Sequence, residues 1–417
     1  MNSEKSLNLL AEKMLGKQIS ILFVMRDPLP PTRPDVKALF GKYLYRLGVR
    51  SDLIGPYADR LNVEDEIWAS GAISFTGKAG GMIGEVIKSL RDIRAICKLS
   101  NQHDIIQVRD RTFSAIAIWI LARIRKKPIV YRMSFPMTEG YEARALEVGW
   151  KKGLLVWIAN HIRAIVARAA FYGFIVKRAD HIFVQSDAML EWMNNKGVAR
   201  ERMTSVPMGV DIEAIEQIQV ISADDIRLDG RRVIIYLGTL SSARNPEFML
   251  EVVDEVRKQY PDVLLVLAGD GEAADEQAWL RQKISDKELE SHVWLTGWLS
   301  QEHALGLVKR AELGLSPIPR GLLFDVSSPT KALEYLALGI PCLGSDIPDQ
   351  RFVLETSGAG LCVPMTVQDF VSSIEKLLAD RSFASSLGER GLEFIKNERS
   401  YERIALNVAK QYHHLLS

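Results

Sequence analysis

Short runs of β-branched and aliphatic residues alternate with longer amphipathic segments along the whole chain. The apolar runs are nearly continuous, as in parallel strands that are buried on both faces of a sheet. We therefore expect strands at residues 18–25, 104–110, 128–134, 181–186, 232–238, 263–270, 292–297, 311–318, 340–346 and 360–364. The intervening segments predict helices at residues 35–47, 112–126, 143–176, 187–196, 245–259, 273–287, 301–310, 329–338, 366–379 and 400–416.

The alternation of strands and helices runs once before residue 205 and starts again after residue 230. Two such series predict an α/β fold with two doubly wound, Rossmann-like domains that face each other across a cleft. We place the first domain at residues 1–207 and the second at 208–397, and expect a C-terminal helix at 398–417 to return to the first domain. Ligands of such sheets bind beyond the carboxyl ends of the strands, so residues that follow each strand are the candidates.

The composition narrows the functional classes. The chain has 417 residues and a formal net charge of +1, so no overall field attracts it to nucleic acid. Its three cysteines, Cys97, Cys342 and Cys362, are too far apart to indicate a disulfide framework or a zinc site. Residues 1–17 lack the apolar core of a signal peptide. We expect a cytoplasmic protein with no metal, no cofactor and no nucleic-acid partner.

The stretch SSPTKALEY at residues 327–335 combines a helix start with an isolated carboxylate. Ser328 is a good N-cap and Pro329 suits the first helical position, so the free N–H groups there would offer an anion site. Glu334, about one and a half turns further on, can accept hydrogen bonds from two vicinal hydroxyls, as in a ribose. A plain capped helix with a solvent-facing glutamate explains the spacing equally well. Further hydroxyls and an ammonium group come from Ser327, Thr330 and Lys331.

Glycines follow three other strands of the second domain. Glycine allows a backbone to approach a ligand closely, or simply to turn tightly. Arg244, beyond the first of these strands, suits a phosphate, although a surface arginine after a glycine turn is the alternative. The ring of Trp298 would either border a nucleobase or cover the core. The other residues of these loops that we expect at the ligand are Gly238, Thr239, Gly269, Gly271, Gly297 and Leu299.

Charged and polar residues also follow the strands of the first domain. They are candidates for the side of the cleft that binds a second substrate, or they pair with one another at its rim. These residues are Arg26, Asp27, Arg33, Arg109, Asp110, Arg132 and Ser134.

Taken together, these loops resemble the retaining glycosyltransferases of the family 4 type, which have the GT-B fold. The motifs that carry the resemblance are Gly238 to Arg244, Gly269-Asp270-Gly271, Thr296-Gly297, and a helix with Lys331, Glu334, Tyr335, Ala337, Gly339 and Pro341. The resemblance implies that the second domain binds a UDP-sugar or GDP-sugar, with Glu334 on the ribose and the Pro329 helix facing the diphosphate. It implies sugar transfer to a hydroxyl of a glycan or lipid-linked glycan in polysaccharide biosynthesis, with retention.

The catalytic candidates follow from the motifs and their departures from the family. Arg244 and Lys331 would neutralise the leaving diphosphate without a metal. The family's first glutamate is Val326 here, and the adjacent Asp325 is the candidate to replace it. The usual arginine after the strand-ending glycine is Thr239, and a frequent first-domain histidine is Ser134. The alternatives are a nucleotide-sugar 2-epimerase of the same architecture and a non-catalytic nucleotide-sugar-binding protein.

One segment also suggests a membrane. We expect a single long helix at residues 143–176 that mixes apolar and basic residues. A helix that lies on the cytoplasmic face of a membrane has this composition, and so does a helix covered by both a sheet and a neighbouring helix. The residues concerned are Trp150, Leu154, Leu155, Trp157, Ile158, Ile162, Ile165, Val166 and Phe171, with Lys151, Lys152, Arg163, Arg168 and Lys177.

Overall fold

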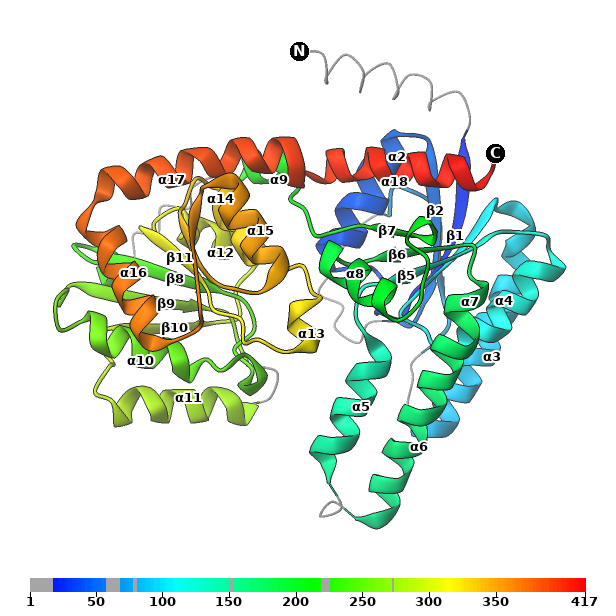
Figure 1. Cartoon of the computed structure of the whole chain (residues 1–417), viewed down its shortest axis with the longest axis horizontal. Coiled ribbons are helices and arrows are strands. Elements are labelled where there is room, and N and C mark those ends of the chain that lie inside the picture. Colours follow the sequence, from blue (N-terminus) through cyan, green and yellow to red (C-terminus); the bar gives the residue numbers. More distant parts are fainter. Residues whose placement is uncertain (1–17, 58–67, 78–80, 150–152, 219–225, 272–273) are drawn as a thin grey trace. The chain divides into compact units, whose positions relative to one another are not determined.

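The structure is a computed structural model that describes residues 18–57, 68–77, 81–149, 153–218, 226–271 and 274–417. The chain forms two compact units (Figure 1), of which unit 1 comprises residues 1–207 and 401–417 and unit 2 comprises residues 208–400. Each unit contains one parallel sheet with helices packed against it. The predicted fold class, two Rossmann-like domains, is confirmed.

The sheet of unit 1 has seven strands in the order β3-β2-β1-β4-β5-β6-β7, and the order reverses between β1 and β4. Three of these strands were not predicted. The run that forms β2 is interrupted by Arg50 and Asp52, and β3 and β7 have only three residues each. The strands are β1 (Ile19–Val24), β2 (Val49–Gly55), β3 (Ile73–Phe75), β4 (Ile105–Arg109), β5 (Ile129–Met133), β6 (His181–Val184) and β7 (Met203–Ser205).

The helices of unit 1 flank this sheet. A π-helical segment at Asp35–Tyr43 leads into α2, and another at Phe171–Ile175 joins α6 to α7. The helices are α2 (Leu44–Arg46), α3 (Gly81–Leu99), α4 (Ser114–Ile124), α5 (Met137–Val148), α6 (Leu154–Ala170), α7 (Val176–Arg178), α8 (Asp187–Asn195) and α18 (Tyr401–Leu415).

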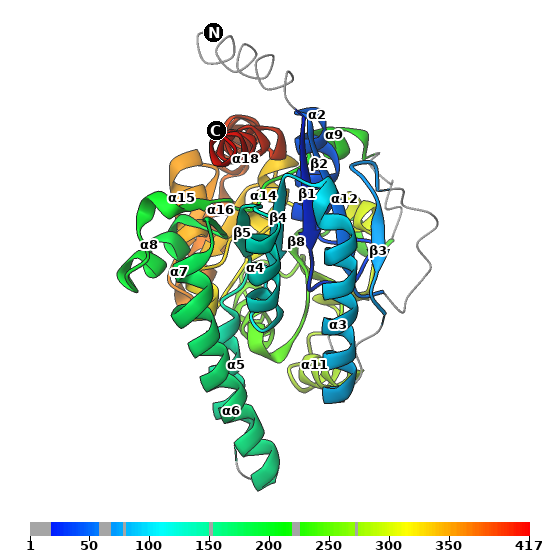
Figure 2. The ribbon, with the colours of Figure 1, turned by 90° about the vertical axis from the view of Figure 1, so that its right-hand side faces the viewer.

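The predicted single helix at residues 143–176 is wrong. The chain breaks between α5 and α6, where Gly149 and Gly153 have φ angles of 55° and 107°. Glycine adopts this left-handed region without the steric cost that a Cβ atom would impose. The two helices pack against each other, and Figures 1 and 2 show them extending away from the sheet of unit 1.

The sheet of unit 2 has six strands in the order β10-β9-β8-β11-β12-β13, and the order reverses between β8 and β11. All six strands were predicted, because each is a short apolar run between a helix and a glycine or polar turn. The strands are β8 (Arg232–Leu237), β9 (Val263–Ala268), β10 (Val293–Gly297), β11 (Leu313–Ser316), β12 (Cys342–Ser345) and β13 (Gly360–Val363).

Two apolar clusters line the faces of this sheet. One contains Phe248 and Phe370, and the other contains Leu333, Tyr335 and Phe394. The helices of unit 2 are α9 (Ile212–Gln217), α10 (Glu247–Val256), α11 (Ala274–Asp286), α12 (Gln301–Val308), α13 (Leu322–Asp325), α14 (Lys331–Ala337), α15 (Pro348–Ser357), α16 (Val367–Ala379) and α17 (Arg381–Phe394).

Helix α18 completes the core of unit 1, although it follows unit 2 in the sequence. Tyr401, Ile404 and Tyr412 are buried in the same cluster as Phe40 and Phe183. The ring of Tyr412 meets that of Phe183 edge-on at a centroid distance of 5.4 Å. The predicted return of the C-terminal helix to the first domain is confirmed.

We predict that Tyr412→Ala lowers the free energy of unfolding of unit 1 by about 3–5 kcal/mol, because it removes a buried aromatic ring. It also deprives Gln107 of the Tyr412 hydroxyl. Urea unfolding followed by tryptophan fluorescence measures the loss. Tyr45→Ala is the control, since Tyr45 is exposed and should change the free energy by less than about 0.5 kcal/mol. Equal, small effects of both variants would contradict the role of α18.

Candidate functional site

Three glycines end or follow β8, β9 and β10 and form a surface made only of backbone. Gly238, Gly269 and Gly297 have φ angles of 134°, 151° and 73°. A Cβ atom on Gly269 would lie 2.0 Å from the carbonyl oxygen of Gly238, and one on Gly238 would lie 3.2 Å from Cε of Lys331. Because these three residues carry no side chains of their own, a ligand can approach the backbone of the strand ends closely.

Helix α14 is held at the point where the strand order of unit 2 reverses. The buried hydroxyl of Tyr335 accepts a hydrogen bond from Leu237 N (2.8 Å) in β8 and donates one to Leu315 O (3.2 Å) in β11. The ring lies against Gly314, where a Cβ atom would come within 2.3 Å of it. Ligands of doubly wound sheets bind at this reversal, so Tyr335 directs α14 to the expected crevice.

Lys331 is the first residue of α14 and is only 6% exposed. Its ammonium group lies 4.7 Å from the centroid of the Tyr236 ring, and it makes no hydrogen bond or ion pair with any described residue. Burial, together with the charge of Arg244, lowers the pKa of Lys331 to about 7. A buried cation without a counter-ion is costly, so this arrangement favours the binding of an anion.

Glu334 lies one turn after Lys331 on the same face of α14. It is partly buried, and its carboxylate accepts no hydrogen bond from any described residue. Burial raises the pKa of Glu334 to about 7, against the opposing effect of the Lys331 charge. The two groups are therefore a lysine and a glutamate that are close but unpaired, and the carboxylate remains available to hydroxyl groups of a ligand.

Arg244 supplies a second cation near the end of β8. Its side chain lies close enough to Tyr236 to oppose the rise that burial causes in the pKa of that hydroxyl, which donates a hydrogen bond to Thr239 O at 3.0 Å. Tyr236 thus lies beneath Lys331 and close to Arg244. Sequence reasoning missed Tyr236, although its place two residues before the strand-ending Gly238 was a usable signal.

The loops after β9 and β10 contain the other predicted ligand residues of unit 2, and these differ in their surroundings. Asp270 Oδ1 accepts hydrogen bonds from Gly271 N (2.8 Å) and Gln277 Nε2 (2.9 Å), which shapes the turn after β9. Trp298, after β10, is 77% exposed, so the prediction that it covers the core is wrong and the prediction that it borders a base remains. Leu299 instead packs against an apolar cluster of unit 2.

The predicted helix start at Pro329 is wrong. Helix α14 begins at Lys331, and Thr330 precedes it without a side-chain capping bond. Ser328 does not cap the helix, because its buried hydroxyl donates to Asp349 Oδ2 at 2.6 Å. The expected anion site therefore depends on the Lys331 side chain and the glycine backbone, not on a long helix.

Two further residues of this loop are engaged within unit 2. The hydroxyl of Ser327 donates to Phe324 O at 2.7 Å. Both carboxylate oxygens of Asp325 accept hydrogen bonds from Arg320, at 2.8 and 3.2 Å, and Val326 is buried. The prediction that Asp325 replaces a catalytic glutamate gains no support, because Arg320 already pairs with its carboxylate.

The first-domain candidates form a buried network in unit 1. Arg109 Nη1 contacts Asp35 Oδ2 at 2.8 Å, and Arg109 Nε lies 3.2 Å from Asp27 Oδ2. Burial alone would raise the pKa of Asp35, but Arg109 and Arg132 hold it well below its usual range. Arg132 also donates to Val184 O and to other acceptors. Arg109 and Arg132 are fully buried, which corrects their prediction as substrate contacts.

Other predicted residues of unit 1 keep some exposure. Arg26 and Arg33 are exposed, and Asp27 and Ser134 are partly buried. Asp110 is buried with a φ angle of 50°, and its carboxylate accepts hydrogen bonds from the backbone N–H and the hydroxyl of Ser134. Asp110 therefore shapes the turn after β5 and does not face a ligand.

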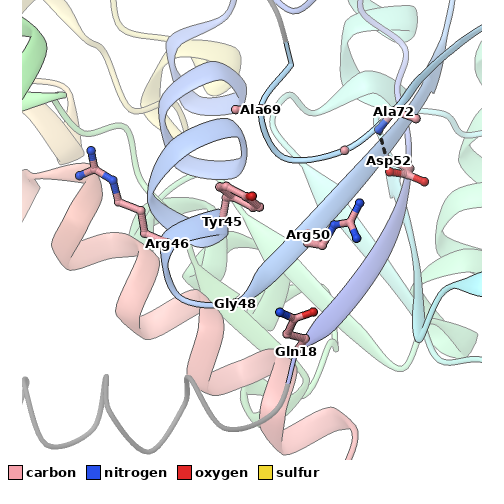
Figure 3. A pocket seen from close by; sticks show the side chains of 9 residues that line it. Gln18, Tyr45, Arg46, Gly48, Arg50, Asp52, Ala69 and Ala72 are labelled. Carbon is pink, nitrogen blue, oxygen red and sulfur yellow. Dashed lines mark hydrogen bonds between the residues drawn. The ribbon is translucent and has the colours of Figure 1, made fainter.

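Two cavities lie away from these residues. One of about 590 Å³ opens at the amino ends of β1 and β2, beside Tyr45, Arg50 and Asp52 (Figure 3). The other, of about 540 Å³, lies beside the edge strand β10, where Arg227 stacks on Trp294. Neither contains a predicted site residue. Within the described ranges, no three histidine, cysteine or acidic side chains gather as a metal site would require.

Two family models match the chain. The model "Glycosyltransferase Family 4" matches residues 38–214, and the model "Glycosyl transferases group 1" matches residues 219–394. Both models describe glycosyltransferases, and together they span most of units 1 and 2. The epimerase and the non-catalytic alternatives are therefore not favoured.

Curated relatives agree with the models. A GDP-mannose-dependent α-(1-6)-phosphatidylinositol monomannoside mannosyltransferase of Mycobacterium tuberculosis is 23% identical over 404 residues, which is 93% of this chain and 97% of the relative. An α-D-kanosaminyltransferase of Streptomyces kanamyceticus is 25% identical over 163 residues. This second match covers 39% of this chain and spans 40% of the length of the relative.

Solved structures share the fold. The HepE protein of Anabaena, in complex with UDP and glucose, superposes with a TM-score of 0.71 at 15% identity, covering 95% of this chain and 100% of HepE. WaaG, a glycosyltransferase involved in lipopolysaccharide biosynthesis, superposes with a TM-score of 0.67 at 13% identity over 94% of this chain and 99% of its own. With the family models on both units, the chain belongs to the GT-B glycosyltransferases of the family 4 type, which transfer a sugar from a nucleotide-sugar to an acceptor.

Proposed function

We propose that the diphosphate of a UDP-sugar or GDP-sugar binds over the backbone at Gly238 and Gly269, between the side chains of Lys331 and Arg244. The observation that carries this proposal is the buried Lys331 ammonium, which makes no hydrogen bond or ion pair with any described residue and lies beside Gly238. A diphosphate supplies the missing negative charge. It also favours the protonated lysine, which reverses the effect of burial on the pKa.

In this proposal, the nucleoside half of the donor uses two further groups. Glu334 accepts hydrogen bonds from the vicinal hydroxyls of the ribose, because its carboxylate is unoccupied and lies one turn from Lys331. The exposed face of Trp298, directly after Gly297, stacks on the base. HepE was solved with UDP, and the mycobacterial relative is named as GDP-mannose-dependent, so both nucleotides belong in a first binding screen.

We infer a transfer that needs neither a metal nor a protein base. The bond between the sugar C1 and the diphosphate oxygen breaks, and a bond from C1 to the acceptor oxygen forms on the same face, with retention. The acceptor hydroxyl gives its proton to the departing phosphate oxygen. Lys331 and Arg244 stabilise the negative charge that develops on the diphosphate.

We propose a lipid-linked glycan as the acceptor and the cytoplasmic face of a membrane as the place of reaction. Helix α6 carries large apolar side chains that the described residues of unit 1 leave exposed, among them Leu155 at 81% and Ile165 at 68% exposure. The helical stretch Leu154–Arg178 is long and apolar enough to cross a membrane by length and composition, and most of its apolar part is not buried. Other exposed residues of this surface are Leu154, Val156, Ile158, Ile162 and Val166.

Basic and aromatic groups near this surface support contact with the lipid headgroups and do not support a membrane-spanning helix. Arg163 stacks on the ring of Tyr141 at 4.3 Å, and the exposed Arg168 pairs with Glu142 at 2.8 Å. Such charges lie at the edge of an interfacial helix and meet anionic lipid. Phe171 is buried, so its prediction as a membrane contact is wrong. Trp157 is half-buried, and Trp150, Lys151 and Lys152 lie outside the described residues.

We predict that Glu334→Gln weakens nucleotide-sugar binding by about 1.5–3 kcal/mol without unfolding the protein, because a charged hydrogen bond to the ribose is lost. In the wild type, the affinity should fall below about pH 7, where the Glu334 carboxylate takes up a proton, and also above it, where Lys331 loses one. The variant should lose the acidic dependence only. Calorimetric titration across this pH range measures both effects, and an unchanged affinity in a folded variant would contradict the ribose assignment.

We predict that turnover survives a chelator such as EDTA, because Lys331 and Arg244 supply the positive charge that other glycosyltransferases take from a metal. Lys331→Met should lower kcat by roughly 100-fold or more, as expected for loss of a preorganised charge at the leaving group. Product formation from a labelled nucleotide-sugar measures both. If EDTA abolishes turnover and Mg²⁺ or Mn²⁺ restores it, the metal-free scheme is wrong.

We predict that the protein sediments with vesicles that contain anionic lipid at low salt and is released as the salt concentration rises. The paired substitution Leu155→Asp with Ile165→Asp should abolish binding, because it places charges on the apolar surface of α6. Leu90→Asp is the matched control, since Leu90 is an exposed leucine on α3 of the same unit. Equal binding by all three proteins, or no binding by the wild type, would remove the membrane contact.

A further inference from the structure

Asp349 connects three separate segments of unit 2 through its two carboxylate oxygens. Oδ1 accepts a hydrogen bond from Arg399 Nη2 at 2.6 Å, and Oδ2 accepts one from the Ser328 hydroxyl at 2.6 Å. All three residues are at least 94% buried. Burial of the Asp349 and Arg399 charges costs free energy, and removal of one partner would leave the other charge buried and unpaired. The positions of these side chains are therefore fixed.

The Ser328 hydroxyl continues this network to the beginning of unit 2. It accepts a hydrogen bond from Met208 N at 3.0 Å while it donates to Asp349. The Ser328 hydroxyl therefore both accepts and donates a hydrogen bond within unit 2, and its one proton is not available to a ligand. Ser328 lies three residues before Lys331, on the loop that leads into α14.

The beginning and the end of unit 2 are also joined directly. Val210 N donates to Arg399 O at 2.8 Å, and Val210 and Ser400 form a parallel bridge. The chain passes between the two units at two points, which we call the crossings. It enters unit 2 at Met208 and leaves it at Ser400. Asp349 therefore lies where both crossings between the units meet the loop that carries Lys331.

We propose that Asp349 is a positioning residue for nucleotide-sugar binding. Its carboxylate holds the Ser328 hydroxyl, and this hydrogen bond sets where the loop before Lys331 lies relative to the two crossings. This inference rests on the proposed function of Lys331. Because the same carboxylate holds Arg399 and Ser328, a change in the path of either crossing changes the loop, and occupation of the site by a diphosphate is transmitted back to the crossings.

Two roles of Ser328 can be distinguished by the effect of changing Asp349: either Ser328 binds the nucleotide itself, or Asp349 acts on the site through Ser328. Asp349 lies in α15, and among the described residues its side chain is hydrogen-bonded to the loop through the Ser328 hydroxyl. If Ser328 touched the nucleotide itself, a change at Asp349 would leave affinity unaltered. If Asp349 acts through Ser328, both changes weaken binding, and the two effects do not add.

The experiment compares UDP and GDP binding by calorimetry for the wild type, Ser328→Ala, Asp349→Asn, the double variant and Ser328→Thr. We expect each single variant to raise Kd about tenfold, the double variant to be no weaker than the weaker single, and Ser328→Thr to recover the affinity by keeping the hydroxyl. Glu312→Gln is the control for stability. It breaks an ion pair with Arg232 at the amino end of β8, so it should lower the unfolding temperature and leave Kd unchanged.

The outcomes separate this proposal from the proposed function. A wild type that binds neither nucleotide overturns both. A wild type that binds, with Ser328→Ala or Asp349→Asn at the wild-type Kd, overturns the positioning role alone, and so do additive effects in the double variant. If Asp349→Asn fails to fold, Ser328→Ala and Ser328→Thr decide the question, because they leave the Arg399–Asp349 pair intact.

Discussion

The Tyr335 hydroxyl holds together the two strands on which the candidate site depends. Where the strand order of a doubly wound sheet reverses, β8 and β11 direct their connections to opposite sides, and this leaves a crevice. The hydroxyl accepts from Leu237 N on one strand and donates to Leu315 O on the other. Because Tyr335 belongs to α14, the same contacts that close the sheet also determine where Lys331 and Glu334 lie.

The two units differ in whether the charged side chains near their strand ends are paired. In unit 1, Arg109 and Arg132 are neutralised by Asp35 and by backbone oxygens, so their charges stabilise the fold and are not available to a substrate. In unit 2, Lys331 and Glu334 are withdrawn from water without being paired. The first arrangement holds the arginines on carboxylate and carbonyl oxygens of the protein itself, whereas the second favours a ligand with both an anionic and a hydroxyl-rich part. This contrast, more than the fold, is the reason for the proposal that unit 2 binds the nucleotide-sugar.

Much of unit 2 could be predicted from the sequence because its strands are uninterrupted apolar runs and its ligand loops begin with glycine. The glycine requirement is local, and a conformation such as the φ of 151° at Gly269 follows from the close approach of Gly238. The errors came from partners distant in sequence. Ser328 has the features of an N-cap, and only the fold brings Asp349 within reach of its hydroxyl. Burial of Arg109 likewise depends on a carboxylate 74 residues earlier.

The prediction of a single helix at residues 143–176 failed because two weak helix-breaking residues lie close together there. Gly149 and Gly153 are ordinary residues in an apolar stretch, and neither alone ends a helix of this length with certainty. Together they reverse the chain and create the pair α5 and α6, of which α6 exposes several large apolar side chains. Strand β2 was missed for the converse reason, since Arg50 and Asp52 conceal a strand that pairs along β1 over six residues.

The return of α18 to unit 1 also has a consequence for how the protein is made. Residues 401–417 are synthesised after all of unit 2, yet Tyr401, Ile404 and Tyr412 belong to the core of unit 1. At the usual rate of about 5–20 residues per second, the ribosome needs roughly 10–40 s to add the 193 residues from Met208 to Ser400. During that interval the sheet of unit 1 lacks part of its cover, so the half of the enzyme that begins first is completed last.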